Sequence, residues 1–374
     1  MKAIVAGGGI GGLAVAAGLH RRGWDVTVLE QTGAFGVVGS AISLWPNAFR
    51  ALAAVGATVP DDRLGGMAGL RDWRGRWLVR MTGEAVPDAV VAHRHDLRAA
   101  LLARVPAECQ LAGVRVRGAR IEGTRVVVEH DGGELSADLL VGADGVNSAV
   151  RRGLWPDAAP PRYSGHTAWR MILPDTPLAE GAETWGPGAV FGTFPMSGDR
   201  VYCYATGAVP PGRRGPDGEL AELRHRFAGW CEPIPALLAA ATEDLVLRND
   251  IHHLPPLPTY VRGPVALLGD AAHAMTPNLG QGGCQALEDA ATLAVAVETQ
   301  PDLPTALRRY DELRRPRTQA MARKALLSRD LSHLRWAPAR MARNALVRAV
   351  PRSLFVKALA QPFAWRPEDG LVRT

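Results

Sequence analysis

Cysteine and aromatic residues are scarce in this sequence. Its 374 residues include four cysteines, and aromatic residues make up 6% of the chain. The cysteines, Cys109, Cys203, Cys231 and Cys284, lie far apart, so no pair has metal-site spacing and a dense disulfide framework is excluded. Reduced, mostly buried thiols are typical of cytoplasmic proteins. We therefore expect no bound metal and a cytoplasmic location.

Long apolar runs and clusters of positive charge are also missing. No stretch approaches the length of a membrane span. Residues 3–19 resemble the apolar core of a signal peptide, but five glycines at positions 7–12 disfavour a signal helix there. The net charge is +6, yet no run of Lys and Arg alternates with aromatic residues. Nucleic acid is therefore not an expected partner, whereas an anionic small molecule would suit the positive charge.

Glycine, in contrast, is abundant and patterned at the start of the chain. Residues 7–12 read GGGIGG and match the G-x-G-x-x-G fingerprint between an apolar strand and a helix. Gly7 permits the tight turn, Gly9 lets a pyrophosphate approach the backbone, and Gly12 lets helix and strand pack closely. Glu30 ends the next strand, where a carboxylate binds ribose hydroxyls and disfavours the 2′-phosphate of NADP. The motif predicts a dinucleotide site without distinguishing FAD from NAD.

Two later stretches favour FAD. Residues 139–152 read LLVGADGVNSAVRR, with Asp144 and Gly145 between a strand and a helix. Residues 263–289 read GPVALLGDAAHAMTPNLGQGGCQALED, in which Asp270 ends a buried strand. A carboxylate there can bind ribitol hydroxyls, and the following loop leads to a helix N-terminus that can stabilise negative charge on a reduced flavin.

In this order, the three stretches resemble the motifs of the para-hydroxybenzoate hydroxylase-like (group A) flavoprotein monooxygenases, the aromatic-ring hydroxylase family. The resemblance covers residues 2 to about 320. It is supported by residues 39–47 (GSAISLWPN), His93-Arg94, 163–170 (YSGHTAWR) and 310–317 (YDELRRPR). GSAISLWPN and GQGGC are most similar to short bacterial members such as the FAD-dependent urate hydroxylases. Only small residues occur near Gly188, where the substrate arginine of that enzyme would be sought, which speaks against urate.

The resemblance implies roles for individual residues. Glu30 would bind the adenosine ribose, Arg94 the phosphate-ribityl side and Asp270 the ribitol, whereas Pro277 would lie near flavin C4a. Arg94 could instead be a solvated arginine at a helix start, and Asp270 a helix or turn cap. His273 is expected to be structural. The implied cofactor-binding residues are Gly7, Gly9, Gly12, Glu30, Ser43, Arg94, Asp144, Gly145, Asp270, Gly280, Gly282 and Gly283.

The resemblance also implies the reaction. NADH or NADPH would dock transiently and reduce FAD, and O2 would add at flavin C4a to give a hydroperoxide. One oxygen atom would pass to an electron-rich aromatic or unsaturated small molecule, by hydroxylation or epoxidation. The alternatives are an FAD-dependent reductase or dehydrogenase on the same fold, such as an isoprenoid reductase, and a non-catalytic flavin-binding protein.

The expected fold is α/β (α+β). A discontinuous Rossmann-like FAD-binding domain (1–70, 93–160 and 262–320) would carry an inserted, mostly antiparallel β-sheet domain for the substrate (71–92 and 161–261). Residues 321–374 would form a C-terminal helical region. Apolar spacing predicts helices over 46–56, 95–105, 219–230, 283–298 and most of 303–350, interrupted at Pro316 and Pro338. The oligomeric state is expected to be a monomer or homodimer.

The substrate pocket is expected between the inserted sheet and residues 42–45. Catalytic roles are assigned to Pro277 and Arg170; Arg170 would anchor a carboxylate or phenolate, or else form an ion pair on the sheet's other face. No general base is evident. Because alternate strand residues face opposite sides, about half of the candidates should point away. The candidates are Ile42, Trp45, Trp169, Arg170, Phe191, Phe194, Met196, Tyr202 and Tyr204.

The C-terminal region has a basic stretch without acidic residues at 335–357. We expect its helix to pack an alanine-rich side on the FAD domain and to leave its arginines in water. The alternative is a helix lying on an anionic membrane, which the small apolar side disfavours. The basic side is formed by Arg340, Arg343 and Arg348, and the apolar side by Ala342, Ala345, Leu346 and Ala349.

Overall fold

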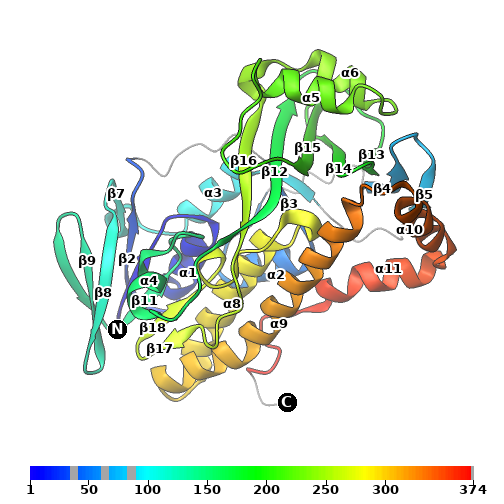
Figure 1. Cartoon of the computed structure of the whole chain (residues 1–374). Helices are drawn as coiled ribbons and strands as arrows, with labels where there is room; N and C mark the ends of the chain where they lie inside the picture. Colours follow the sequence, from blue (N-terminus) through cyan, green and yellow to red (C-terminus); the bar gives the residue numbers. More distant parts are fainter. Residues whose placement is uncertain (34–40, 60–66, 82–89, 372–374) are drawn as a thin grey trace.

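The computed structural model describes residues 1–33, 41–59, 67–81 and 90–371, and the strands of this described part form two large sheets and two small ones (Figure 1). Parts of the expected domains, residues 34–40, 60–66, 82–89 and 372–374, lie outside the described residues. The mixed α/β fold, with a Rossmann-like parallel sheet and C-terminal helices, agrees with the fold class expected from the sequence.

The first sheet has six strands in the order β17-β18-β11-β1-β2-β7. All adjacent pairs are parallel except β17 with β18. Because parallel strands end at the same edge, the residues that follow β1, β2, β11 and β18 are brought together there. The strands are β1 (Lys2–Ala6), β2 (Asp25–Glu30), β7 (Gln110–Ala112), β11 (Leu139–Gly142), β17 (Val261–Arg262) and β18 (Val265–Leu267).

Helices cover this sheet and connect its strands. Helix α1 packs against α8, and residues of both belong to the main hydrophobic core. The helices are α1 (Ile10–His20), α2 (Pro46–Ala54), α3 (Arg94–Leu102), α4 (Ala149–Leu154), α7 (Asp270–His273) and α8 (Gly282–Thr299), with 3-10 turns η2 (Ala107–Cys109) and η4 (Pro277–Leu279). A small antiparallel sheet beside α4 contains β8 (Val116–Glu122), β9 (Arg125–His130) and β10 (Gly133–Ala137).

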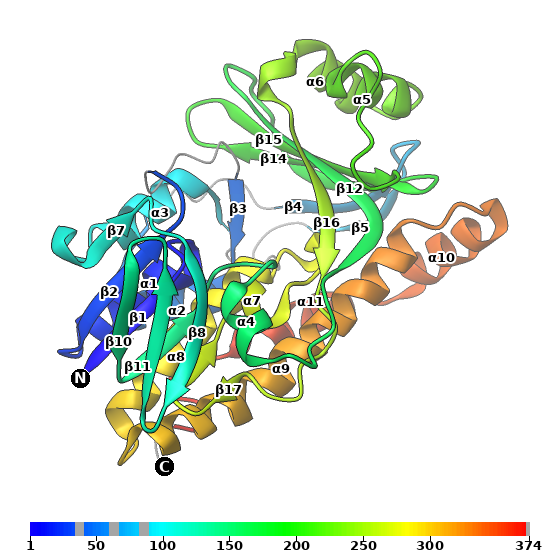
Figure 2. The ribbon, with the colours of Figure 1, turned by 60° about the vertical axis from the view of Figure 1, so that its left-hand side comes forward.

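The second sheet has seven strands in the order β16-β12-β15-β14-β13-β4-β5, antiparallel except for β13 with β4. Helices α5 (Glu219–Phe227) and α6 (Ile234–Ala240) cover one face, and Figure 2 shows β12 and β16 reaching from this sheet towards the first one. Strand β4 begins at residue 67, earlier than the expected boundary at 71. The strands are β4 (Met67–Asp72), β5 (Trp77–Arg80), β12 (Arg162–Leu173), β13 (Gly181–Trp185), β14 (Ala189–Met196), β15 (Arg200–Ala208) and β16 (Leu247–His253).

A two-stranded ribbon lies between the sheets, and helices complete the chain. The ribbon pairs β3 (Ala41–Leu44) with β6 (Val90–His93). Pro316, expected to interrupt the C-terminal helices, lies inside the 30-residue α9, whose neighbouring side chains Arg314 and Thr318 are buried on both sides of it. The remaining elements are η3 (Glu243–Leu245), α9 (Leu303–Ser332), α10 (Ala337–Ala349), α11 (Arg352–Ala360) and η5 (Gln361–Ala364).

Candidate active site

The glycine turn after β1 leaves room for a ligand at one position and closes the others by packing. Gly7 has a φ of +105°, and a Cβ there would lie 2.4 Å from the Ala143 carbonyl oxygen. A Cβ on Gly12 would lie 1.9 Å from the Gly7 carbonyl oxygen, whereas a Cβ on Gly9 would meet nothing within 4 Å. The backbone is therefore tightly held against β11 at Gly7 and open at Gly9, as a bound pyrophosphate requires.

Glu30 is fixed beside this turn by hydrogen bonds. Its Oε2 accepts from the Gly8 N–H at 2.7 Å, and its Oε1 accepts from the Thr32 N–H at 2.9 Å. The carboxylate keeps further acceptor sites for ribose hydroxyls. The Nη2 of Arg98 donates to the Gly8 carbonyl at 2.9 Å. Sequence reasoning missed Arg98, although it lies one helical turn after the predicted Arg94.

Asp144 links the end of β11 to the start of α4. Its Oδ2 accepts from the N–H groups of Ala149 at 2.7 Å and Val150 at 3.2 Å. Its Oδ1 is buried and has no hydrogen-bond partner among the described residues. Gly145 follows with a φ of +77° and with open space at its Cβ position. One oxygen of the carboxylate thus caps α4, and the other is available to a ligand.

The loop before α8 also presents unsatisfied polar atoms. Thr276 Oγ1 and Gln281 Nε2 are buried without partners among the described residues. Gln281 is the N-cap of the 18-residue α8, so its amide lies where the helix N-terminus favours negative charge. Gly280 in this loop and Gly282 at the start of α8 carry no side chain. Pro277, predicted to be catalytic, begins η4 in the same loop.

Strand β3 lies directly against this loop. A Cβ on Gly283 would lie 2.4 Å from Ile42 Cδ1, and a Cβ on Gly280 would lie 3.7 Å from Ser43 Cβ. Trp45, just after β3, stacks on Phe363 of η5 with ring centroids 4.4 Å apart. The structure therefore brings three residues predicted from a distant stretch to the start of α8, and it adds an aromatic contact from the C-terminal region.

Arg94 interacts electrostatically with charged or polar groups from three other elements. Arg94 begins α3, Arg170 lies on β12, Tyr202 on β15 and Asp270 at the start of α7. Partial desolvation, then the positive charge of Arg170, lowers the pKa of Arg94, whereas Asp270 and Tyr202 raise it. Burial raises the pKa of Tyr202, opposed by the charges of Arg170 and Arg94. Predicted cofactor and substrate residues are thus electrostatic neighbours.

The two faces of the second sheet separate the substrate candidates. Met196 and Tyr202 are buried together with Ala41, packed against Phe194 and Tyr204, on the face towards β3. Arg170 is the register partner of Tyr204 and shares that face. Its Nη1 donates to Asn249 at 3.3 Å. This face, which we call the inner face, collects most of the candidates.

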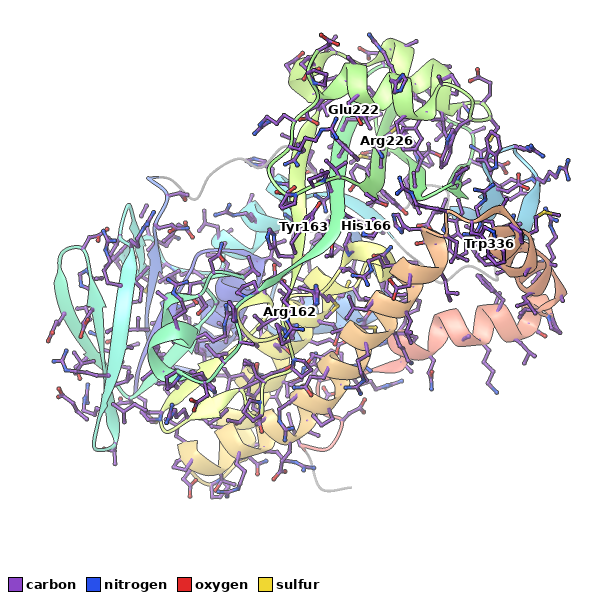
Figure 3. All side chains as sticks on the ribbon, viewed as in Figure 1. Arg162, Tyr163, His166, Glu222, Arg226 and Trp336 are labelled. Atoms are coloured by element: carbon purple, nitrogen blue, oxygen red, sulfur yellow. The ribbon has the colours of Figure 1, made fainter. Side chains whose placement is uncertain are left out.

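Trp169 and Phe191 lie on the outer face and are not brought to the site. Both belong to the core beneath α5 and α6, where Phe191 meets the ring of Phe227 at 5.1 Å. The Trp169 Nε1 donates to Glu219 at 2.7 Å, and Arg226 lies over the indole ring; Figure 3 labels Arg226 beside these helices. Strand alternation places them there, as it must for about half of any such set.

Glu183 on β13 is an inner-face carboxylate that the sequence did not indicate. It accepts from Trp185 Nε1 at 2.5 Å and from the Tyr204 hydroxyl. Burial raises the pKa of Glu183, and burial with the nearby Glu183 charge raises that of Tyr204. A Cβ on Gly192 would lie 2.2 Å from the Tyr204 ring, so only glycine lets the tyrosine lie across β14.

A buried ionic network holds α8 against α9. Arg314 donates to Glu288 at 2.5 Å and to Asp289 at 2.7 Å, and all three side chains are almost fully buried. Asp289 also contacts His273 Nε2 at 2.5 Å and accepts from the Gly269 N–H. His273 is thus tied into this structural network, as expected from the sequence.

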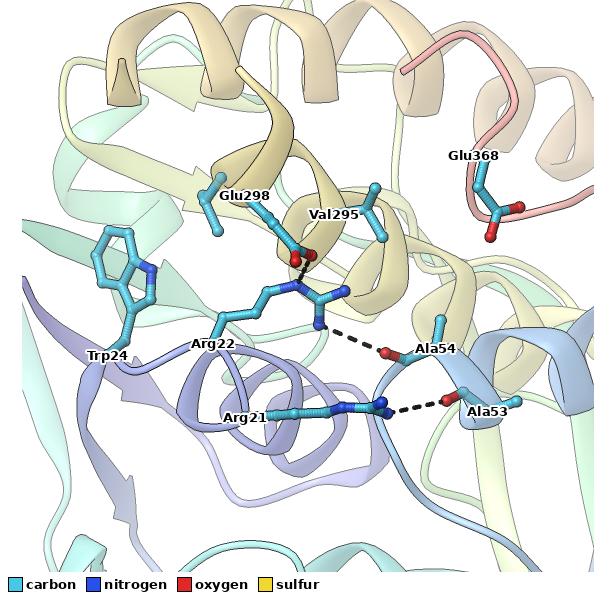
Figure 4. Close-up of a pocket in the computed structure, with 9 residues that line it drawn as sticks. Arg21, Arg22, Trp24, Ala53, Ala54, Val295, Glu298 and Glu368 are labelled. Carbon is cyan, nitrogen blue, oxygen red and sulfur yellow. Dashed lines mark hydrogen bonds and ion pairs between the residues drawn. The ribbon is translucent and has the colours of Figure 1, made fainter. Parts of the chain in front are cut away.

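A pocket of about 550 Å³ lies elsewhere and contains none of these motifs (Figure 4). It is lined by residues that follow α1, by the end of α2 and by α8, among them Arg21, Arg22 and Glu298. Arg22 Nε donates to Glu298 at 2.6 Å, and both arginines donate to carbonyls of α2. These groups satisfy one another, so the pocket carries no reactive arrangement.

Known proteins resemble this chain along most of its length. Residues 256–325 match an FAD binding domain, and residues 5–55 match an NAD(P)-binding Rossmann-like domain. The aurachin C monooxygenase/isomerase of Stigmatella aurantiaca is 38% identical over 331 residues, covering 84% of this chain and 85% of the relative. The FAD-dependent urate hydroxylase of Klebsiella pneumoniae is 35% identical over 352 residues, covering 89% and 91%.

Solved structures are also similar to this chain. HpxO of Klebsiella pneumoniae, complexed with FAD and uric acid, superposes with a TM-score of 0.89 at 30% identity, covering 97% of this chain and 96% of that chain. A salicylate hydroxylase substrate complex, at 24% identity and a TM-score of 0.81, shares the fold. The chain belongs to the FAD-dependent monooxygenases of the aromatic-ring hydroxylase type.

The protein is therefore an oxidoreductase with FAD as cofactor and NAD(P)H as electron donor, as the sequence predicted. It acts with O2 on a small-molecule substrate. The two relatives named above are a monooxygenase/isomerase and a hydroxylase, which agrees with the monooxygenase function rather than with the alternatives of a reductase or a non-catalytic flavin protein. When bound, FAD accepts a hydride from NAD(P)H and activates O2 for transfer of one oxygen atom.

Proposed function

We propose that the inner face of the second sheet holds an electron-rich aromatic or unsaturated substrate, with Arg170 anchoring an anionic or phenolic oxygen. The observation that carries this proposal is the electrostatic interaction of Arg94 with Arg170, Tyr202 and Asp270, which come from three other elements. Arg170 and Tyr202 belong to the substrate sheet, whereas Asp270 follows a strand of the FAD-binding sheet. A substrate between them would lie beside the predicted ribitol site.

The chain's own residues would orient the substrate and exclude water. Phe194, Met196, Tyr202 and Tyr204 supply an apolar and aromatic surface. Because burial raises the pKa of Tyr202, its hydroxyl stays protonated near pH 7 and can donate a hydrogen bond. Arg170 supplies the positive charge that a phenolate or carboxylate would need. No base is required for a substrate that is already electron-rich.

On the cofactor side, we propose that Glu30 binds the adenosine ribose and Asp270 the ribitol. The free Asp144 Oδ1 and the atoms at Thr276 and Gln281 support this assignment because bound FAD would give buried polar atoms their missing partners. For the other predicted cofactor-binding residues, we propose the FAD-binding roles that the family resemblance implies.

We further propose that the described parts of residues 71–92 and 161–261 form the substrate domain, and that the protein is cytoplasmic and monomeric or homodimeric.

Urate is not favoured as the substrate. Near Gly188, a Cβ would lie 2.9 Å from Arg335 Cγ, and the Gly188 N–H donates to the Leu334 carbonyl at 3.2 Å. The chain just before α10 therefore packs against this part of the sheet.

The test is a substrate screen in which NAD(P)H oxidation, product and hydrogen peroxide are measured together. Phenols, indoles, quinolones, purines and polyenes are compared, and we expect one electron-rich class to stimulate oxidation with little peroxide. Oxidation of ketones to esters alone would contradict electrophilic oxygenation.

A substitution tests the role of Arg170. With the best substrate, Arg170→Met should raise KM about 10- to 100-fold, which corresponds to the loss of a charge-assisted hydrogen bond. Arg162→Met, an exposed change on the same strand, is the matched control.

A further inference from the structure

Helix α10 turns its charged side to the protein and its apolar side to water. Arg343 is buried, its guanidinium lies 4.8 Å from the ring centroid of Trp185, and it donates to carbonyls at the end of α9. Arg340 is half-buried. In contrast, Met341 is 72% exposed and Leu346 is 69% exposed. The sequence-based expectation of an alanine-rich side packed on the protein was therefore wrong.

The inversion follows from helical spacing. Positions 340, 343, 344 and 347 form the side that faces the protein, whereas positions 341, 342, 345, 346 and 349 are all exposed. Arg343 is drawn inward because it satisfies the last carbonyls of α9 and lies over an indole ring. A helix in water is expected to show the opposite arrangement, so the outward apolar side lacks a covering partner within the described chain.

Exposed apolar side chains are concentrated around this helix. Of nine large hydrophobic residues that are exposed among the described residues, seven fall between 327 and 354. Figure 1 shows the end of α9 together with α10 and α11 at one end of the molecule, and Figure 3 labels Trp336 there. We call these residues the α10 surface: Leu327, Leu331, Trp336, Met341, Leu346, Val350 and Leu354.

The charged groups around the α10 surface are mostly basic, although Arg348 pairs with Asp72 and Asp330 lies beside Leu331. Between Asp330 and Glu368 the chain has seven basic residues and no acidic residue. An anionic bilayer presents negatively charged headgroups over apolar acyl chains. Exposed apolar groups flanked by basic groups are complementary to such a surface. Two of the seven, Arg340 and Arg343, face the protein. The five exposed basic residues are Arg335, Arg348, Arg352, Lys357 and Arg366.

We propose that the α10 surface docks on a bilayer that contains anionic lipids, with α10 and α11 lying along the interface. Met341, Leu346 and Leu354 would enter the boundary between headgroups and acyl chains, and Trp336 would lie at headgroup level, where indole rings are favoured. Lys357 would face the lipid headgroups. None of the described helices is long and apolar enough to cross a membrane, so docking would be peripheral.

A second copy of the chain is a weaker occupant. A twofold contact uses the same patch on both subunits. It would bring together two surfaces that each carry five exposed basic residues from a stretch without acidic residues. Like-charge contacts of this kind oppose association, whereas anionic lipids neutralise the same residues.

Sedimentation of the full-length FAD-loaded protein with lipid vesicles tests the proposal. Vesicles of phosphatidylcholine alone are compared with vesicles that contain about one third phosphatidylglycerol, at about 0.15 M salt. We expect binding to the anionic vesicles only. Met341→Ser/Leu346→Ser should weaken that binding roughly tenfold or more, and Lys357→Glu should weaken it at this salt but not at high salt, where the charge contribution is screened.

The matched control is Leu111→Ser, which changes an apolar residue that is 38% exposed on β7, far from α10 (Figure 1). All variants should keep their FAD content and NAD(P)H oxidation, which separates this surface from the active site. Absence of vesicle binding, or equal binding by the double variant, would overturn the proposal. The proposal would also be overturned if the wild type formed a dimer in solution and did not bind vesicles, and if the double variant were monomeric.

Discussion

The guanidinium of Arg314 lies at the centre of the ionic network between α8 and α9. Its removal should markedly lower the free energy of unfolding. The side chain is 1% exposed, and it donates to Glu288 and Asp289, both fully buried, at 2.5 and 2.7 Å. Arg314→Met keeps the bulk of the side chain and leaves two buried carboxylates less well compensated. Arg317 still contacts Glu288 and His273 still contacts Asp289, so neither carboxylate is left entirely alone. The free energy of unfolding should nevertheless fall by about 3–5 kcal/mol, which is typical of a broken buried ion pair.

Thermal unfolding followed by flavin fluorescence measures this loss. For a chain of this size, about 4 kcal/mol corresponds to a fall in Tm of about 5 °C. The matched control is Arg309→Met, whose ion pair with Glu312 is exposed to solvent and should contribute about 0.5 kcal/mol or less. Equal effects of the two substitutions would refute the reasoning from burial.

The same variant should also weaken FAD binding. Glu288 Oε1 accepts from Asn47 at 2.6 Å, and Asn47 donates to Gln281, the N-cap of α8, at 3.1 Å. Disturbing Glu288 therefore disturbs the predicted flavin-binding end of α8. Equilibrium dialysis of Arg314→Met with FAD measures the effect, and an unchanged Kd would separate the network from the cofactor site.

Three further predictions concern single residues. Glu30→Ala should weaken FAD retention about tenfold through the loss of its ribose hydrogen bonds; flavin per protein after gel filtration measures this, with Glu298→Ala as control, and unchanged retention would disprove the assignment. Asp270→Ala should lose flavin or release hydrogen peroxide during NAD(P)H oxidation, and full coupling with full FAD content would exclude its predicted role. Burial lowers the pKa of His333 to about 4, so the folded protein holds it neutral. Its contribution is complete above about pH 6.5 and is lost as the pH falls towards about 4, by up to about 3 kcal/mol. His333→Asn should flatten the pH dependence of unfolding there, and an unchanged slope would contradict this account.

The FAD-binding half was readable because its signals are local. Gly7, Gly9 and Gly12 must lie in one turn, and Glu30 must end the next strand, so spacing along the chain reports their positions in space. The Asp144 and Asp270 motifs were readable for the same reason, since each follows a strand of one parallel sheet. Their specific roles in cofactor binding remain predictions.

The substrate side could be predicted only in part. Composition indicated the strands that carry Trp169, Phe191, Tyr202 and Tyr204, but not which side of the sheet each residue faces. Strand alternation fixes relative orientation only, and the packing of α5 and α6 decided which face became the core. Glu183 gave no signal because the Tyr204 hydroxyl that it accepts from lies on a different strand, β15.

Sequence alone determined the family, the cofactor and the order of the elements, because these depend on short motifs whose residues act as neighbours along the chain. Tertiary structure decided the meeting of Arg94, Arg170 and Tyr202, and it decided the orientation of α10. The helical pattern specified two opposite sides, but Arg343 had partners at the end of α9 and over Trp185 that no local pattern reveals. Interactions between distant segments therefore selected which side of the helix met the protein.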